Sequence, residues 1–376
     1  MKKKTILAAA VACFTLAGLF SAVSAAEVEE TDVETSADGT DATAASVTVE
    51  CDKFSVNIPA RAVELCDIEA ATDSIAIYEK IAHADGAGFV GSINLYENVH
   101  DYCDIPNFAR GGEISYPDNT KLDIVLTYPS DVQYDFNSEE SVDAWMALQD
   151  IFNEEIAPSI QPREEGTFIP QNEVDNTSIY DETLAALYQD LSEKKDQAAL
   201  EEDGFSYLYA MNYKEGDDPL YTFGYTFVDL TGTGYPELVI MKDDGSPIVY
   251  DLFTQTDGKV RHVFSSAERD YVTLLGHEGH SPRTLCEHAS GGADVTEINT
   301  YIMDPGTKEL ISQVSFIYDS TENQENPWAV RYGPDEELEF LDEAEWNQRM
   351  ENFGVENLFK LIPIAAADAS ADADAA

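Results

Sequence analysis

Hydrophobic and polar residues alternate along several stretches of the first half of the chain, as they do in half-buried β-strands. These stretches are residues 54–58, 74–81, 88–96 and 122–128. The period then changes to that of a helix, which Ser138 can cap and Pro158 ends. The apolar face of this helix comprises Val142, Trp145, Leu148, Phe152 and Ile156. Strands followed by one packed helix predict an α+β domain over residues 47–160.

The second half of the chain begins with a helical pattern and then changes to the period of strands. Ser178 starts the predicted helix, with Asp181 three positions later as in a capping box. Its apolar stripe comprises Tyr180, Leu184, Leu187, Tyr188 and Leu191. Strand-like stretches then recur at 220–227, 238–241, 248–264, 271–275, 295–303, 310–318 and 358–364. Asp257-Gly258 predicts a hairpin, and short connections predict an antiparallel meander in a second α+β domain, 178–364, with a late helix starting at Asp342.

Segments of biased composition flank these two small domains, each of which we expect to be an antiparallel sheet with packed helices. Residues 26–46 are acidic and lack aromatic side chains, which predicts a disordered spacer. Residues 161–177 contain prolines, a glycine and acids, and predict a linker. Residues 365–376 contain only Ala, Asp and Ser and predict a disordered tail.

The first 25 residues have the pattern of a secretory signal peptide. Lys2, Lys3 and Lys4 precede an apolar stretch, which ends in small residues at Ala25. The stretch is short for a membrane anchor, and no later segment is long and apolar enough to span a bilayer. We therefore expect a secreted, extracellular protein, free or held non-covalently to the cell envelope.

The net negative charge of the chain argues against two classes of partner. The formal charge is −52, and it becomes −55 when the signal peptide with its three lysines is removed. Nucleic acids and anionic lipid surfaces both require a positive patch, so neither is an expected partner. The 44% hydrophobic content is sufficient for real cores. The expected partner is an extracellular or cell-envelope ligand of unknown identity, and the oligomeric state stays open.

Four cysteines remain after the signal peptide: Cys51, Cys66, Cys103 and Cys286. Export permits disulfides, and a Cys51–Cys66 bridge is the pairing that we favour among the three connectivities. Four small buried thiols are the alternative, because a chain of this length does not need disulfide bonds for its stability.

Two stretches carry a resemblance to a known group of proteins. Residues 123–136, DIVLTYPSDVQYDF, resemble an N-terminal domain of exported two-domain proteins from Gram-positive, Clostridia-like anaerobes. Residues 225–241, YTFVDLTGTGYPELVIM, resemble a second module of these proteins, in which an Asp-Gly-rich loop enters a strand through a Glu-Leu pair. Residues 289–293 fit the later glycine-rich turn of that module. The resemblance implies an architecture, but it implies no catalytic residue because the group has no assigned activity.

The loop 229–237 is the first candidate site. Calcium loops place oxygen ligands at positions one, three, five, seven and nine, with glycine at six. Here these positions hold Asp229, Thr231, Thr233, the carbonyl of Tyr235, and Glu237, with Gly234 at six. Position twelve is Ile240 instead of a bidentate glutamate, and the resembling module usually has aspartate where both threonines stand. Calcium is therefore a candidate cofactor, and the alternative is a tight loop in which Asp229 binds backbone amides.

A histidine and cysteine cluster is the second candidate site. Its members are His277, His280, Cys286 and His288. These ligand types suit zinc, but the spacing matches neither HExxH nor paired CxxC motifs. Polar hairpin residues exposed at a sheet edge are the alternative.

These observations favour an exported, non-catalytic binding or scaffold protein. No P-loop or nucleophile elbow occurs, and with 73 acidic residues chance carboxylate pairs carry no signal for glycoside cleavage. The alternative function is a metal-binding protein or a metal-dependent hydrolase that uses the 229–237 loop or the 277–288 cluster.

Overall fold

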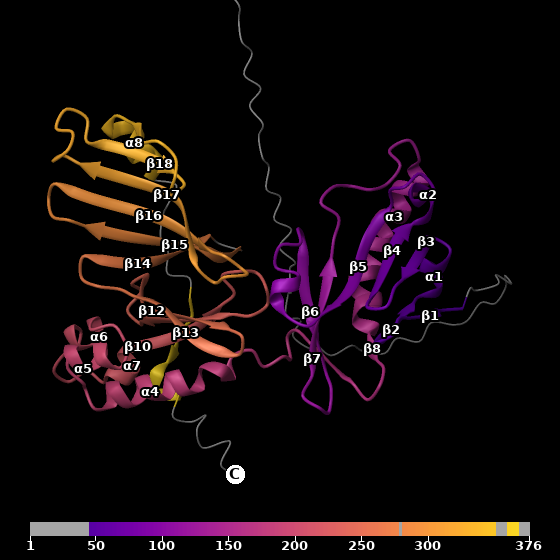
Figure 1. Ribbon diagram of the computed structural model, residues 1–376, viewed down its shortest axis with the longest axis horizontal. Coiled ribbons are helices and arrows are strands. Elements are labelled where there is room, and N and C mark those ends of the chain that lie inside the picture. The colour runs from indigo at the N-terminus through magenta and orange to yellow at the C-terminus, as the bar shows by residue number, and fades with distance from the viewer. Residues whose placement is uncertain (1–44, 278–279, 351–358, 368–376) are drawn as a thin grey trace, which may run out of the picture. The chain divides into compact units, whose positions relative to one another are not determined.

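Antiparallel strand pairing dominates the protein, with helices packed against the sheets, so the fold class is α+β as predicted (Figure 1). The computed structural model describes residues 45–277, 280–350 and 359–367. The predicted signal peptide, nearly all of the predicted acidic spacer and residues 368–376 lie outside the described residues. In the described parts of the chain, the structure contains no helix both long and apolar enough to cross a membrane.

The first half of the described chain forms two sheets. A six-stranded sheet has the order β3–β4–β5–β7–β6–β9, and a three-stranded sheet has the order β1–β2–β8. The strands are β1 (Val47–Glu50), β2 (Phe54–Ile58), β3 (Cys66–Ala70), β4 (Ser74–Glu79), β5 (Phe89–Tyr96), β6 (Phe108–Ser115), β7 (Lys121–Thr127), β8 (Gln161–Pro162) and β9 (Thr167–Pro170). Short helical turns connect them: α1 (Ala60–Val63), α2 (Lys80–His83) and η1 (Val99–Asp101).

The helix α3 (Glu139–Ile151) packs against β4 and β5 and continues through the turns η2 (Phe152–Ile156) and η3 (Ala157–Ser159). Ser138 caps it as predicted, because its hydroxyl accepts the backbone N–H of Ser141. The indole N–H of Trp145 donates to the carbonyl of Phe89 at 2.9 Å. The predicted apolar stripe therefore faces a core in which Leu148 and Phe152 are fully buried.

The second half of the described chain forms one eleven-stranded sheet. Its strands are β10 (Phe223–Val228), β11 (Glu237–Lys242), β12 (Ile248–Thr256), β13 (Lys259–Ser265), β14 (Asp270–His277), β15 (His280–Ser290), β16 (Val295–Met303), β17 (Leu310–Asp319), β18 (Trp328–Tyr332), β19 (Glu339–Phe340) and β20 (Ile362–Pro363). Successive strands from β10 to β19 pair as neighbours, except that β13 and β14 both pair with β12. The predicted meander and its Asp257-Gly258 hairpin are therefore present (Figure 1).

Helices cover parts of this sheet. They are η4 (Ser178–Tyr180), α4 (Asp181–Ser192), α5 (Gln197–Glu202), α6 (Leu208–Met211), α7 (Pro219–Thr222), α8 (Glu343–Met350) and η6 (Ile364–Ala366). Leu184, Leu187 and Leu191 of α4 belong to a core with Phe223 and Leu238 of the sheet. Trp346 of α8 joins a separate small core at the far end of the meander.

The structure differs from the sequence-based expectation in several segments, of which three concern predicted boundaries. The segment predicted as a linker, 161–177, instead contributes β8 and β9, which pair with β2 and β6. The predicted start of the strand at 220 is the helix α7, because Pro219 at its first turn and the Asp218 cap favour helix there. The predicted tail begins later than residue 365, since Ala367 is buried in the same core as α4.

All four cysteines of the described residues are free thiols, and Cys51, Cys66 and Cys286 are buried. Of the two alternatives that the sequence left open, the structure therefore has unpaired thiols.

Candidate functional site

The loop 229–237 connects β10 to β11 and is organised around the carboxylate of Asp229. This carboxylate accepts the backbone N–H groups of Gly232 at 2.6 Å, Thr233 at 3.1 Å and Gly234 at 2.8 Å. Gly232 and Gly234 adopt φ angles of 74° and 82°, which side chains disfavour. The two glycines thus let the chain wrap its amides around one aspartate.

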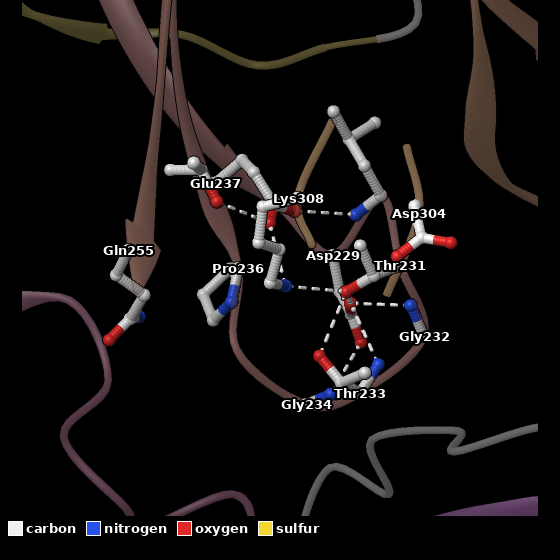
Figure 2. Close-up of polar contacts among 12 residues, drawn as sticks. Asp229, Thr231, Gly232, Thr233, Gly234, Pro236, Glu237, Gln255, Asp304 and Lys308 are labelled. Carbon is white, nitrogen blue, oxygen red and sulfur yellow. Dashed lines mark hydrogen bonds and ion pairs between the residues drawn. The ribbon is translucent and has the colours of Figure 1, made fainter. Parts of the chain in front are cut away.

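Glu237 ends the loop as a fully buried carboxylate. It accepts the backbone N–H of Leu230 at 2.9 Å, the hydroxyl of Thr254 at 3.1 Å and the ammonium of Lys308 at 3.2 Å. Figure 2 shows that Lys308 reaches from another part of the chain to both Glu237 and Thr231, with a distance of 2.9 Å from its Nζ to the Thr231 hydroxyl. Burial raises the pKa of Glu237 above its ordinary value, and the ammonium of Lys308 opposes this shift.

The four side chains among the predicted calcium ligands lie together in the loop. Asp229, Thr231, Thr233 and Glu237 surround the interior of the loop, and the hydroxyls of the two threonines lie 2.8 Å apart (Figure 2). The predicted ligand of Tyr235 is its backbone carbonyl, and its side chain lies outside this group, in contact with Asp123. Among the residues that the structure describes, no group of three or more His, Cys, Asp or Glu could hold a metal ion.

Tyr235 joins a buried ionic network. Its hydroxyl donates to both carboxylate oxygens of Asp123, at 2.8 and 2.9 Å, and its ring lies 4.3 Å from the guanidinium carbon of Arg110. Arg110 donates to Asp123 at 2.8 and 2.6 Å, and Tyr102 donates to the same carboxylate at 2.8 Å. Burial raises the pKa of Tyr102 and of Tyr235, so both phenols stay protonated donors. The network ties the loop to strands β6 and β7.

The backbone positions of the predicted zinc ligands are spread along two strands. His277 and His280 pair at the turn between β14 and β15, whereas Cys286 and His288 lie farther along β15. His280 and Cys286 are six positions apart, which is about 20 Å along a strand, while zinc holds its ligands at about 2 Å. Burial raises the pKa of the Cys286 thiol to about 12, and His288 stacks on Tyr271 with ring centroids 4.9 Å apart.

The sequence patterns did not predict a cluster of Asp251, His262 and Ser265. Asp251 lies on β12, and the other two residues lie on the neighbouring β13. The Nε2 atom of His262 lies 3.0 Å from the Ser265 hydroxyl and 3.3 Å from Asp251 Oδ1. Ser265 also donates directly to Asp251, whose second oxygen accepts from Tyr209 at 2.8 Å and from the backbone N–H of Ser206 at 3.2 Å.

His262 and Ser265 line an open hollow of about 350 Å³. The hollow is lined by Glu201, Gly204, Phe205, Ser206, Tyr207, His262, Ser265, Ser266 and Ala267. The available sequence signal was Asp251 itself, a charged residue within the apolar run IVYDLF. A buried carboxylate needs donors nearby, but the sequence alone does not say which ones.

Comparisons with known proteins identified no relative of this chain. No protein-family model, curated protein or solved structure matches the chain. The positions of the chain's own residues are therefore the basis for inferring its function.

Proposed function

We propose that this protein is an exported, non-catalytic binding protein that takes a small polar ligand in the hollow beside Ser265. The observation that carries the proposal is the geometry of His262, whose Nε2 atom contacts both Ser265 and Asp251. The hollow supplies the volume and the polar groups for a ligand, while this geometry argues against turnover.

A Ser-His-Asp relay needs both ring nitrogens of the histidine, one for the serine and the other for the aspartate. Here one nitrogen serves both contacts, and the Ser265 hydroxyl donates to Asp251 itself. The proton of Ser265 is thus held by the carboxylate instead of being transferred to the imidazole. This favours a structural role for the cluster in shaping the hollow.

An acyl-transfer site also needs free backbone N–H groups to stabilise an oxyanion. Several N–H groups around the hollow already donate within the fold. They belong to Gly204, Phe205, Ser206, Ser266 and Ala267. This supports binding without catalysis.

The volume of about 350 Å³ lies at the small end of the range for ligand pockets, which is about 300–1,000 Å³. Phe205 offers an apolar surface, and the exposed parts of His262 and Ser265 offer hydrogen-bonding groups. Glu201 in the lining of the hollow and the strongly acidic chain disfavour an anion. A small neutral or cationic polar molecule fits these features.

Two measurements test the proposal. We expect no Ser265-dependent turnover of ester, peptide or glycan substrates, with Ser265→Ala as the comparison. A thermal-shift screen of small polar molecules should find ligands whose effect disappears in Ala267→Phe, which fills the hollow. The effect should persist in Ala185→Phe, which places the same ring at an exposed position of helix α4. Robust turnover that Ser265→Ala abolishes would contradict a non-catalytic role.

The export and domain organisation are part of the same proposal. Separate sheets and separate hydrophobic cores support two domains that meet near residue 177. The N-terminal lysines and small-residue site support secretion. N-terminal sequencing of protein from the culture medium should begin after Ala25 or Ala26, and a chain lacking residues 2–25 should stay inside the cell.

A further inference from the structure

We propose that the Lys308 ammonium is a built-in counter-ion of the loop 229–237. It lies where loops of this ligand pattern hold a divalent cation, and it makes the folded loop independent of metal. The inference concerns a different site from the proposed ligand hollow, so either can fail without the other.

The position of the ammonium is the first argument. Counting Asp229 as position one, Lys308 Nζ contacts the ligands of positions three and nine, Thr231 at 2.9 Å and Glu237 at 3.2 Å. The Lys308 side chain is only 3% exposed, and that of Glu237 is fully buried. A buried ammonium this close to a buried carboxylate neutralises the charge that a cation would otherwise balance.

The ligand oxygens are the second argument. An ionised carboxylate has about four acceptor positions. Asp229 fills four with three backbone N–H groups and the Thr231 hydroxyl, which lies at 3.3 Å. Glu237 accepts from Leu230, Thr254 and Lys308. A metal ion would therefore have to displace donors that the fold already provides.

The charge of the site points the same way. Calcium affinity depends on the number of charged ligands, and positions three and five are neutral Thr231 and Thr233. Asp229 and Glu237 supply two negative charges, and Lys308 cancels one of them. A divalent cation would meet a single net negative charge and a neighbouring ammonium. The donor set of this chain does not fit calcium while Lys308 is present.

The backbone of Lys308 is an independent argument. Its φ angle is 59°, in the left-handed region where glycine or asparagine is the ordinary choice. The β16–β17 turn holds this conformation, because Asp304 accepts the N–H groups of Gly306 at 3.0 Å and Thr307 at 2.6 Å. Arg261 also donates to the carbonyl of Lys308. A lysine in a strained position, with its side chain buried in a loop 71 residues away, is consistent with a requirement for the ammonium.

Lys308→Met tests the inference, because it keeps an unbranched apolar chain and removes the charge. We expect the melting temperature to fall by about 10 °C, since a buried carboxylate loses its partner. Millimolar calcium should recover part of this loss. The unaltered protein should show the same melting temperature with calcium and with a chelator. Lys242→Met, which removes the partially exposed pair with Asp244, is the control and should show no calcium response.

A second variant keeps the inference falsifiable if Lys308→Met does not fold. Lys308→Met combined with Glu237→Gln removes both charges, and it should fold and ignore calcium. Calcium binding by the unaltered chain that Thr231→Val abolishes would overturn the inference. A Lys308→Met protein that is as stable as the unaltered one, or that is destabilised and does not respond to calcium, would overturn it as well.

Discussion

Replacing Arg110 by methionine should destabilise the protein more than any single change to an exposed ion pair. The Arg110 side chain is 1% exposed and lies between two carboxylates, Asp123 at 2.6 Å and Glu113 at 3.3 Å. It also donates to Gln171 at 2.8 Å and packs on the ring of Tyr235. Methionine fills a similar volume, so the substitution removes the charge and the donors with little loss of packing.

The magnitude follows from what Arg110 leaves behind. Removing one partner of a buried ion pair costs about 3–5 kcal/mol, because the remaining charge is uncompensated in a poorly solvated position. Asp123 keeps the two phenol donors Tyr102 and Tyr235, and Glu113 keeps Lys121 at 2.9 Å. These remaining partners place the expected loss toward the lower end, at about 3 kcal/mol.

Urea unfolding at neutral pH measures this loss, with Arg349→Met as the control. Arg349 contacts two carboxylates as Arg110 does, Glu339 at 2.9 Å and Glu345 at 2.8 Å, but at the surface of the protein. We expect a much smaller change there. In a double-mutant cycle, Arg110→Met with Asp123→Asn should lose less than the sum of the single changes. A loss below about 1 kcal/mol for Arg110→Met, the range of exposed pairs, would refute the reasoning.

Three further predictions follow from single contacts. Gly88→Ala should lower the melting temperature, because Gly88 has a φ of 84° and an added Cβ would lie 2.5 Å from the carbonyl oxygen of Glu79. Cys286 should react with iodoacetamide far more slowly than the partly exposed Cys103 in the folded protein, since burial raises the pKa of its thiol to about 12; equal rates in a mass-spectrometric time course would contradict this. The backbone N–H of Thr307 lowers the pKa of Asp304 in the folded protein below its ordinary value of 3.8. The stability that Asp304 contributes is therefore present above pH 3.8 and is lost as the pH falls through the lower pKa of the folded state. In urea unfolding, the difference in stability between the unaltered protein and Asp304→Ala should narrow below about pH 4.

Periodicity predicted the elements whose stability is local in origin. The stretch 295–303 is the strand β16, and Ser138 caps α3, because alternation and capping act within a few residues. The strand β9 was missed because its segment contains acids and Pro170, which an edge position beside β6 tolerates. The short helices α5 and α6 were missed for another reason: their buried Leu200 and Tyr209 gain stability from the sheet that they contact rather than from helix propensity.

The residues of the candidate sites also fall into two groups: those that a local pattern predicts, and those that only the tertiary fold brings into the site. The sequence alone placed Asp229 and Glu237 in one loop, because loop ligands recur at fixed short spacings. It could not place Lys308, which approaches from another hairpin, nor Tyr235 beside Asp123, which is 112 residues away. Asp251 and Ser265 meet only through the pairing of β12 with β13. A local pattern can therefore predict a set of metal ligands, but it cannot predict whether a distant side chain already occupies the position of the metal.

The scarcity of basic residues explains why those distant side chains matter so much. With 73 acids and 21 bases, a buried carboxylate has few cations available to it. Arg110 contacts both Asp123 and Glu113, and Lys195 contacts Asp190 at 2.6 Å and Asp203 at 2.7 Å. Salt in the medium can screen repulsion among surface acids, but it reaches buried pairs much less. A buried base such as Arg110 must therefore do what dissolved cations cannot. Replacing it should destabilise the protein at every ionic strength, whereas replacing an exposed base should matter mainly at low salt.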